Sequence, residues 1–286
     1  MEVSILGVGK MGGAIYNNLS VNAKYKLALI DPNIDKIYKS FGESTNSNPP
    51  LVYKNLSRYI DDLSQKKTIL VLAIKPKQLF PLYKEIMALK TLSLTNSIIV
   101  SIVAGISVST LRTIFKTDNI VRAMPNTPAT VGQGMTGLYF PKKISGKSKK
   151  EVLTLFNLLG RTLVVNSEKK LHSVTALSGS GPAYFFNFCE ALLSTSKELG
   201  LSKKEAFILV EQTFIGACAL FTESKIPVNI LRKNVTSPGG TTETALNTLK
   251  KCNFSTGVFK AILNARDRSM EIGTELNSEI KQNTQK

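Results

Sequence analysis

The stretch of this chain that is best suited to chemistry is a turn that leads into a helix. It reads Ser237-Pro238-Gly239-Gly240-Thr241-Thr242 and is followed by a helical pattern over Glu243–Lys251. The first N–H groups of a helix lack intrahelical partners and carry partial positive charge, so they favour an anion such as a carboxylate. The hydroxyls of Ser237, Thr241 and Thr242 add donors beside them. The pattern predicts a site for a small carboxylate, and an ordinary capped turn is the alternative.

A second motif with a chemical meaning lies near the N-terminus. Gly7-Val8-Gly9-Lys10-Met11-Gly12 is a G-x-G-x-x-G sequence between the apolar run Val3–Leu6 and a helical pattern. In this context the first glycine permits a tight turn, and the second lets the backbone approach a pyrophosphate. The third lets the helix pack against the strand. The motif predicts a dinucleotide site.

Asp31 is the acidic residue expected of such a site. It ends the predicted strand Lys26–Ile30 and follows Gly12 by 19 residues. A carboxylate there accepts from both ribose hydroxyls of an adenosine and repels a 2′-phosphate, which favours NADH over NADPH. Lys36 carries a charge that would offset this repulsion. The alternative role for Asp31 is to cap the helix that follows Pro32.

The first part of the chain alternates strands with helices. Further strands are predicted at Leu51–Tyr53, Thr68–Ile74, Ser97–Val103, Asn119–Ala123, Gly134–Phe140 and Thr162–Val165. This alternation predicts an α/β, Rossmann-like doubly wound sheet, in which ligands bind at the carboxyl ends of the strands. The residues at such ends, which we expect to wall the cofactor cleft, are Asn55, Ala73–Pro76, Ile102–Ala104 and Met124–Thr127.

From Glu168 onward the pattern is helical. The apolar run Leu171–Leu199 is interrupted by Ser178-Gly179-Ser180-Gly181-Pro182, which indicates either a close approach of a ligand or helix or a plain kink. Helices are also predicted at Ser202–Thr222 and Phe254–Gly273, and the polar tail from Asn277 is expected to fray. We therefore predict an NAD(P)-binding domain over 1–166 and an all-α domain over 167–286 that binds substrate and, because it is apolar all round, forms a homodimer.

Composition narrows the class of protein. The 286 residues allow two domains, and the net charge of +17 is spread over a surface in which only Lys142–Lys150 is dense, without interleaved aromatic residues. No nucleic-acid partner is therefore predicted. The three cysteines are far apart, and no cluster has metal-ligand spacing, so reduced thiols and no metal are expected. No apolar run is expected to approach the roughly 20 residues that span a bilayer, and no leader precedes the first strand, so a cytoplasmic protein is predicted.

Several separated motifs resemble one family, pyrroline-5-carboxylate reductase, which makes L-proline by reducing a cyclic imine. The matching pieces are Gly7–Gly12, Ala73–Pro76, Met124-Pro125-Asn126-Thr127-Pro128, Thr175–Tyr184 (TALSGSGPAY) and Pro227 through Lys250 with its VTSPGGTT centre. They occur in the family's order and cover essentially the whole chain, and the last two are much more specific than the first, which many dinucleotide enzymes share. Lys250-Lys251 departs from the acidic pair that is usual in the family.

The resemblance implies where NADPH or NADH and a cyclic imino acid would bind. The cofactor residues would be Leu6, Gly7, Val8, Gly9, Lys10, Met11, Gly12, Asp31, Asn55, Ala73, Ile74, Lys75, Pro76, Ala104 and Asn234. The substrate residues would be Glu168, Ser237, Gly239, Gly240, Thr241 and Thr242, with Ser237 and the glycine amides on the carboxylate. It also implies a dimer of intertwined helical domains, which in this family is often assembled into a ring.

Imine reduction needs few catalytic groups from the protein. A protonated imine accepts hydride readily, so catalysis is mostly positioning. The Thr242 hydroxyl is predicted to be catalytic, by bonding the ring nitrogen and relaying a proton. His172, the single histidine, is the other possible acid, but it is expected on a helix surface.

Two other functions compete with this interpretation. β-Hydroxyacid dehydrogenases share the glycine motifs, but they need a catalytic lysine where this chain has Tyr184. A non-catalytic dinucleotide-sensing module would share the fold without needing an intact Ser237–Thr242 corner. Oxidation of NADH with pyrroline-5-carboxylate, and reduction of NAD⁺ with 3-hydroxy acids, would distinguish the three.

Overall fold

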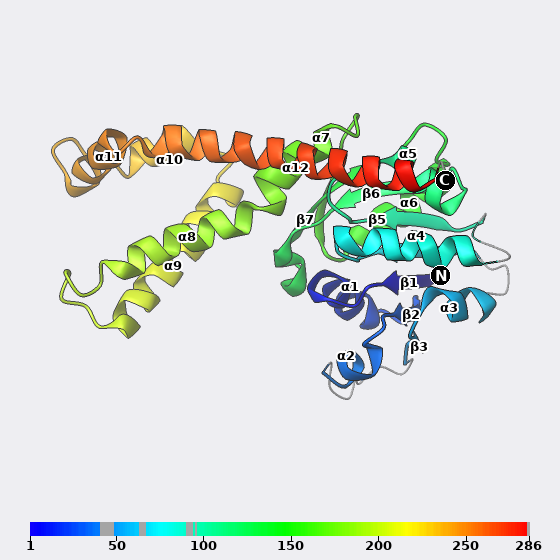
Figure 1. Ribbon diagram of the computed structural model, residues 1–286. Helices are drawn as coiled ribbons and strands as arrows, with labels where there is room; N and C mark the ends of the chain where they lie inside the picture. The colour runs from blue at the N-terminus through cyan, green and yellow to red at the C-terminus, as the bar shows by residue number, and fades with distance from the viewer. Residues whose placement is uncertain (41–48, 63–66, 90–93, 95, 285–286) are drawn as a thin grey trace. The chain divides into compact units, whose positions relative to one another are not determined.

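The computed structural model describes residues 1–40, 49–62, 67–89, 94 and 96–284 (Figure 1). Most of the asparagine- and serine-rich segment 42–50 lies outside the described residues. The described chain divides into two compact units, unit 1 (Met1–Gly181 with Ala265–Lys286) and unit 2 (Pro182–Asn264). Each unit is taken in turn.

Unit 1 is built on an eight-stranded sheet. Its strands are β1 Glu2–Leu6, β2 Lys26–Ile30, β3 Leu51–Tyr53, β4 Thr68–Leu72, β5 Ile98–Ser101, β6 Ile120–Met124, β7 Gly134–Tyr139 and β8 Gly160–Val164. Their order is β3-β2-β1-β4-β5-β6-β7-β8, and every neighbouring pair is parallel except β6 and β7. The first six strands have the order of a dinucleotide-binding sheet, so the predicted doubly wound fold is confirmed.

The strands are continuously apolar because both faces of the sheet are covered. In β4 all five residues are buried, and they alternate between two separate cores. Ile69 and Val71 belong to one buried cluster, and Leu70 and Leu72 belong to the other. This is the two-residue period of a strand with a core on each side.

The helices of unit 1 before residue 181 are α1 Lys10–Ser20, α2 Ile34–Ser40, α3 Leu56–Asp62, α4 Leu79–Ala88, α5 Val108–Phe115, α6 Gly146–Asn157 and α7 Lys170–Val174, with short 3₁₀ turns η1 Pro76–Gln78 and η2 Thr127–Val131.

The last helix, α12, runs from Phe254 to Thr284 and contributes residues to both units. The expectation that the chain frays from Asn277 was wrong. Leu276 and Ile280 are buried, and Ile280 belongs to the core cluster on one face of the sheet. An apolar residue every four positions on one helix face holds this segment against unit 1, although most of its other residues are polar.

The compact units differ from the division predicted at residue 166/167. Helix α7 and the turn after it belong to unit 1, because Leu171 and Ala176 are buried there, and so does α12 from Ala265 onward. The compact units are defined by contacts within one chain, whereas 1–166 and 167–286 were predicted as functional domains. That functional division remains a prediction.

Unit 2 is entirely helical. Its helices are α8 Gly181–Ser194, α9 Lys203–Glu223, α10 Val228–Asn234, α11 Thr241–Lys251 and the first part of α12. A π-helical turn, η3 Thr175–Gly179, separates α7 from α8, so the predicted interruption at the Ser178–Pro182 motif is confirmed. The start of α9 is the predicted capping box, in which Glu205 N donates to Ser202 Oγ at 3.2 Å and Ser202 N donates to Glu205 Oε2 at 2.8 Å.

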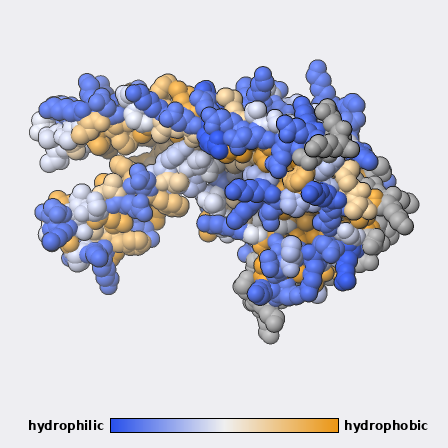
Figure 2. All heavy atoms as spheres, in the orientation of Figure 1, coloured by the Kyte–Doolittle hydropathy of each residue, from blue (hydrophilic) through white to orange (hydrophobic). Residues whose placement is uncertain are grey.

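Unit 2 has almost no core of its own. All its residues are described, yet Ala206 is the only buried apolar residue among them. Figure 2 shows apolar side chains at the surface of its helices. Helix α9 has 21 residues and a window of mean hydropathy 1.4, so the expectation that no stretch approaches membrane-spanning length was wrong for this helix. Length and composition alone are weak grounds for a membrane span, and a helix that is apolar all round also suits a protein interface.

Candidate functional site

The three glycines of the N-terminal motif have three different surroundings. A Cβ on Gly7, whose φ is +91°, would lie 2.7 Å from the carbonyl oxygen of Ala73. A Cβ on Gly12 would lie 2.0 Å from the carbonyl oxygen of Gly7, so helix and loop are in backbone contact there. A Cβ on Gly9 would meet nothing within 4 Å. The open position is the one at which a pyrophosphate approaches the backbone in this motif.

The start of α1 is suited to a phosphate group. Gly9 is its N-cap and has no side chain to cap the helix, and the first turn contains no acidic residue. The N–H groups of this 11-residue helix therefore keep their partial positive charge for a ligand. Lys10 is exposed in the same turn. The residues present fit the diphosphate of a dinucleotide.

Asp31 has the capping role that the sequence left open and also binds the glycine loop, and its role at a ribose remains a prediction. Its Oδ2 accepts from Val8 N at 2.9 Å, which fixes the glycine loop to the end of β2. Its Oδ1 accepts from Asn33 N at 2.9 Å, as expected of a residue that caps the turn into α2. The carboxylate is therefore held beside the loop, at the place where the ribose of an adenosine would lie.

The other predicted cofactor residues of unit 1 lie at the same edge of the sheet. Ala73 N donates to Leu6 O at 2.8 Å, so the chain stays extended one residue past the end of β4. Asn55 Oδ1 accepts from Arg58 N at 3.0 Å, and Lys75 N donates to Gln78 Oε1 at 2.9 Å. These bonds fix the turns that follow β3 and β4. The predicted residues that the sheet brings to this edge are Leu6, Gly7, Val8, Gly9, Asp31, Asn55, Ala73, Ile74, Lys75, Pro76 and Ala104.

A pocket of about 300 Å³ opens among these strand ends. Leu6, Ile30 and Ile74 form part of its apolar lining, and Lys54 and Asn55 add polar groups. A mostly apolar cleft with a few polar groups at the carboxyl ends of parallel strands is suited to the adenosine part of a dinucleotide.

The corner predicted to hold a carboxylate is a turn in unit 2, but its glycine amides are not free. Gly239 N donates to Glu243 Oε2 at 2.8 Å, and Gly240 N donates to Ser237 O at 3.0 Å. Both amides are thus bonded within the chain, since Glu243 reaches back from the first turn of α11, and their role at the substrate carboxylate remains a prediction. The N–H groups of Thr241 and Thr242, the first two residues of α11, have no acceptor within the helix.

Comparison with known proteins decides the family. Residues 168–272 match the family model described as pyrroline-5-carboxylate reductase dimerisation, and residues 2–105 match that of NADP oxidoreductase, coenzyme F420-dependent. The chain is 34% identical over 278 residues to the pyrroline-5-carboxylate reductase of Haemophilus influenzae, covering 95% of this chain and 97% of that one. The chain belongs to the pyrroline-5-carboxylate reductase family.

Solved structures of the same family agree over nearly the whole chain. The reductase of Plasmodium falciparum with NADP bound is 29% identical, with a TM-score of 0.75 and coverage of 94% of this chain and 99% of that one. The reductase of Streptococcus pyogenes is 28% identical, with a TM-score of 0.79 and coverage of 95% and 98%.

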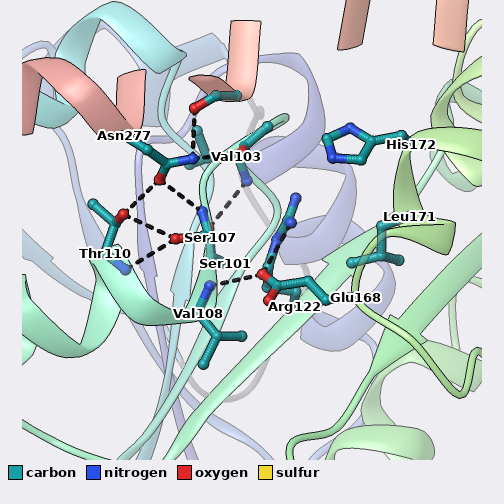
Figure 3. Close-up of polar contacts among 12 residues, drawn as sticks. Ser101, Val103, Ser107, Val108, Thr110, Arg122, Glu168, Leu171, His172 and Asn277 are labelled. Carbon is teal, nitrogen blue, oxygen red and sulfur yellow. Dashed lines mark hydrogen bonds and ion pairs between the residues drawn. The ribbon is translucent and has the colours of Figure 1, made fainter. Parts of the chain in front are cut away.

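The predicted substrate residue Glu168 of this reductase lies in unit 1 and is bound by protein groups. Its Oε1 accepts from Val108 N at 2.7 Å and from Arg122 Nη1 at 3.2 Å (Figure 3). The Arg122 side chain is 4% exposed and that of Glu168 is 29% exposed. Burial lowers the pKa of Arg122, and the neighbouring Glu168 carboxylate opposes that shift. Glu168 thus connects β6 to the start of α5, and its role at the substrate remains a prediction.

His172 is not on the surface, contrary to expectation. It is half-buried in α7, where Figure 3 shows it, and its Nδ1 lies 2.9 Å from Oγ of Ser269 on α12. Burial lowers its pKa from the ordinary value of 6.5, and the positive charge of Arg122 lowers it further. His172 therefore joins α7 to α12, and that it is not the acid of the reaction remains a prediction.

Two motifs of the reductase family meet in unit 1. Asn126, from the Met124–Pro128 segment, donates from Nδ2 to Ser178 O at 3.2 Å, and its Oδ1 accepts from Met135 N at 2.8 Å. A Cβ on Gly179 would lie 2.9 Å from Cε of Met124. The close contact at Gly179 is made by the side chain of Met124 rather than by a helix backbone, and the π-helical turn η3 lies between α7 and α8, as the kink alternative has it.

The remaining predicted residues lie in unit 2. Asn234 is the last residue of α10. The segment that follows contains Ser237, Gly239 and Gly240 and leads into Thr241 and Thr242, the first residues of α11. That they face the nicotinamide remains a prediction.

The sequence interpretation missed Arg122 and Asn277, although a charged residue inside the apolar run Ile120–Met124 is a signal of buried pairing. Asn277 gave no such signal.

Proposed function

We propose that this protein reduces 1-pyrroline-5-carboxylate to L-proline with NADPH or NADH, the last step of proline biosynthesis. The observation that carries the proposal is the uncapped start of α1, left open at Gly9, in a chain that belongs to this reductase family along nearly its whole length. The chemistry needs a dinucleotide and a grip on a small carboxylate, and the chain offers residues for both.

The cofactor would be held at the carboxyl edge of the sheet. Its diphosphate fits the amides at Gly9–Gly12, and the ribose hydroxyls fit the carboxylate of Asp31. When bound, the nicotinamide supplies the hydride. We further propose that Asn234 contacts the cofactor from unit 2.

The substrate would be held at the start of α11. We propose that the N–H groups of Thr241 and Thr242 and the hydroxyl of Ser237 bind its carboxylate, while Gly239 and Gly240 shape the turn. The Thr242 hydroxyl would hydrogen-bond the ring nitrogen and supply or pass the proton that this nitrogen keeps in proline. The C=N bond becomes a single bond, with the hydride on carbon and the proton on nitrogen.

The assembly would be a homodimer through the helical part, and a ring of dimers is the larger state that we propose. Support comes from the match of residues 168–272 to the family's dimerisation domain and from the near absence of a core in unit 2. We propose a cytoplasmic location, with no membrane or nucleic-acid partner. The apolar length of α9 would then be covered by a second copy rather than by lipid.

The full-length protein tests the reaction directly. NADPH and NADH oxidation should each depend on added pyrroline-5-carboxylate, and 3-hydroxy acids should not reduce NAD⁺. Thr242→Ala should lower kcat by about 100-fold or more, with nucleotide Kd unchanged within about twofold. Thr248→Ala, in the same helix and exposed, is the matched control. An inactive parent protein would refute the reaction, and equal effects of Thr242→Ala on kcat and nucleotide Kd would refute the role of this hydroxyl.

The preference between the two nucleotides tests Asp31 separately. Its carboxylate is fixed beside the glycine loop by two backbone bonds, so it would repel a 2′-phosphate. We expect NADH to be used at least as well as NADPH. A kcat/KM more than tenfold higher for NADPH would show that this interpretation of Asp31 is wrong.

A further inference from the structure

Helix α12 touches the loop after β5 backbone to backbone. Gly105 follows the predicted cofactor residue Ala104 and has a φ of +80°. A Cβ on Gly105 would lie 2.8 Å from Cα of Gly273 in α12, and a Cβ on Gly273 would lie 2.7 Å from the carbonyl oxygen of Gly105. Each partner must therefore be a glycine for the helix to lie this close to the loop.

Asn277, one turn further along α12, binds the same loop through both ends of its side-chain amide (Figure 3). Its Oδ1 accepts from Ser107 N at 3.1 Å and also from the Thr110 hydroxyl. Its Nδ2 donates to Gly273 O within the helix and lies 3.5 Å from Gly105 O. A single side chain thus ties α12 to the loop and to the first turn of α5.

The N-terminus of α5 is closed by protein groups. Ser107 is its N-cap, and the Ser107 hydroxyl accepts from Thr110 N at 3.0 Å. Glu168 accepts from Val108 N, and Asn277 accepts from Ser107 N. These bonds satisfy the amides of Ser107, Val108 and Thr110, so this end of the helix serves to fix the loop that precedes it.

We propose that Asn277 is a positioning residue that fixes the cofactor-lining segment Ile102–Ala104 by tying the following residues, Gly105 and Ser107, to α12. The inference rests on the proposed function, because that function places the cofactor against Ala104. The segment is attached on its other side as well, where Ile102 N donates to Leu72 O at 3.1 Å. Without Asn277, the half next to α5 would lose its anchor to α12.

Loss of this anchor should appear in cofactor binding rather than in substrate affinity. A displacement of about 1 Å in a group that aligns reacting atoms lowers the rate by about 100-fold. Asn277→Ala should therefore raise the Kd for NADPH about tenfold and lower kcat, while KM for the imine stays within about twofold.

The experiment uses the full-length protein and measures NADPH binding by fluorescence without imine, then steady-state kinetics. Ser278→Ala, exposed on the same helix, is the matched control and should behave as the parent. A folded Asn277→Ala protein with nucleotide Kd and kcat within twofold of the parent overturns the proposal. A fall in thermal stability with both values unchanged overturns it as well, because that result describes a purely structural residue.

A milder variant decides the matter if Asn277→Ala does not fold. Thr110→Val keeps the β-branched shape and removes one bond to Asn277, so it should raise the NADPH Kd about threefold. An unchanged Kd in this variant overturns the proposal. The binding assay needs no turnover. A parent protein that binds NADPH but does not reduce the imine would therefore refute the proposed function and leave the role of Asn277 open to this test. A parent protein that does not bind nucleotide overturns both.

Discussion

The two compact units of this reductase differ in how much apolar surface each buries within a single chain. Unit 1 surrounds its sheet with two buried clusters, one on each face. Unit 2 contains 83 residues, from Pro182 to Asn264, and buries one apolar side chain, that of Ala206. Hydrophobic stabilisation is roughly 25 cal/mol for each Å² of apolar surface buried, so unit 2 gains little from folding alone.

The difference shows which parts of the proposed chemistry depend on assembly. Most of the predicted dinucleotide residues lie in unit 1, at the carboxyl edge of its sheet, and Asn234 is the one that lies in unit 2. The Ser237–Thr242 corner lies in unit 2, which contains an apolar cavity of about 660 Å³ lined by residues such as Phe185, Phe188 and Phe254. The aromatic rings of Phe188 and Phe254 have centroids 6.0 Å apart, and both remain partly exposed. Cofactor binding should therefore survive a break in the assembly, and turnover should not.

The largest predicted effect comes from a charge placed on an exposed apolar side chain of unit 2. It tests whether unit 2 depends on assembly while unit 1 does not. Phe186 on α8 is 63% exposed in one chain, and we expect the proposed homodimer to cover it. Phe186→Glu would bury an unpaired carboxylate in that contact, at a cost of several kcal/mol. We expect smaller particles in sedimentation and loss of reductase activity. Val21→Glu, at a residue 80% exposed in unit 1, is the control and should change neither. Unchanged sedimentation of Phe186→Glu would show that this face is not an interface.

The sequence predicted unit 1 well because its signals are local. Apolar runs, glycine motifs and capping residues act within a few positions, and strands such as β2 and β3 were predicted with the observed limits. The glycine motif fixed the role of α1 because Gly7, Gly9 and Gly12 act on neighbouring backbone. What failed there was the end of α12, whose order comes from contacts with residues far away in the chain.

Asn277 and Gly239 show two ways in which the site escaped prediction. The bond between Asn277 and Ser107 joins residues 170 positions apart, and an asparagine in a polar stretch carries no pattern that reveals it. The bond from Gly239 to Glu243 is local and had a signal, since a glutamate at the third position of a helix commonly reaches back to the preceding turn. The first contact needed the fold, whereas the second needed only the capping rule.

The buried ion pair of unit 1 gives the next largest effect. Arg122→Met would leave the half-buried Glu168 without its cation, and breaking such a pair costs about 3 kcal/mol. Lys143→Met is the matched control, because Lys143 contacts Asp118 at 2.7 Å with both side chains well exposed, and it should leave the melting temperature unchanged. Thermal unfolding at one fixed protein concentration measures both, since assembly contributes to apparent stability. Equal melting temperatures for the two variants would show that the Arg122–Glu168 pair does not stabilise unit 1.

The smallest predicted effect is a change in the pH dependence of stability when His172 is replaced. It tests whether unit 1 contains a neutral imidazole beside the Arg122–Glu168 ion pair. Burial and Arg122 depress its folded pKa below 6.5, so the unfolded chain takes up its proton at a higher pH than the folded one. The stability from neutral His172 is therefore fully present above pH 6.5 and is lost as the pH falls through that value toward the folded pKa. His172→Asn, which keeps a polar group facing Ser269, should retain activity within about twofold and lose less stability than the parent between pH 7.5 and 5.5. Parallel stability curves for the two proteins would contradict the buried neutral imidazole, and a large loss of kcat would return His172 to the list of possible acids.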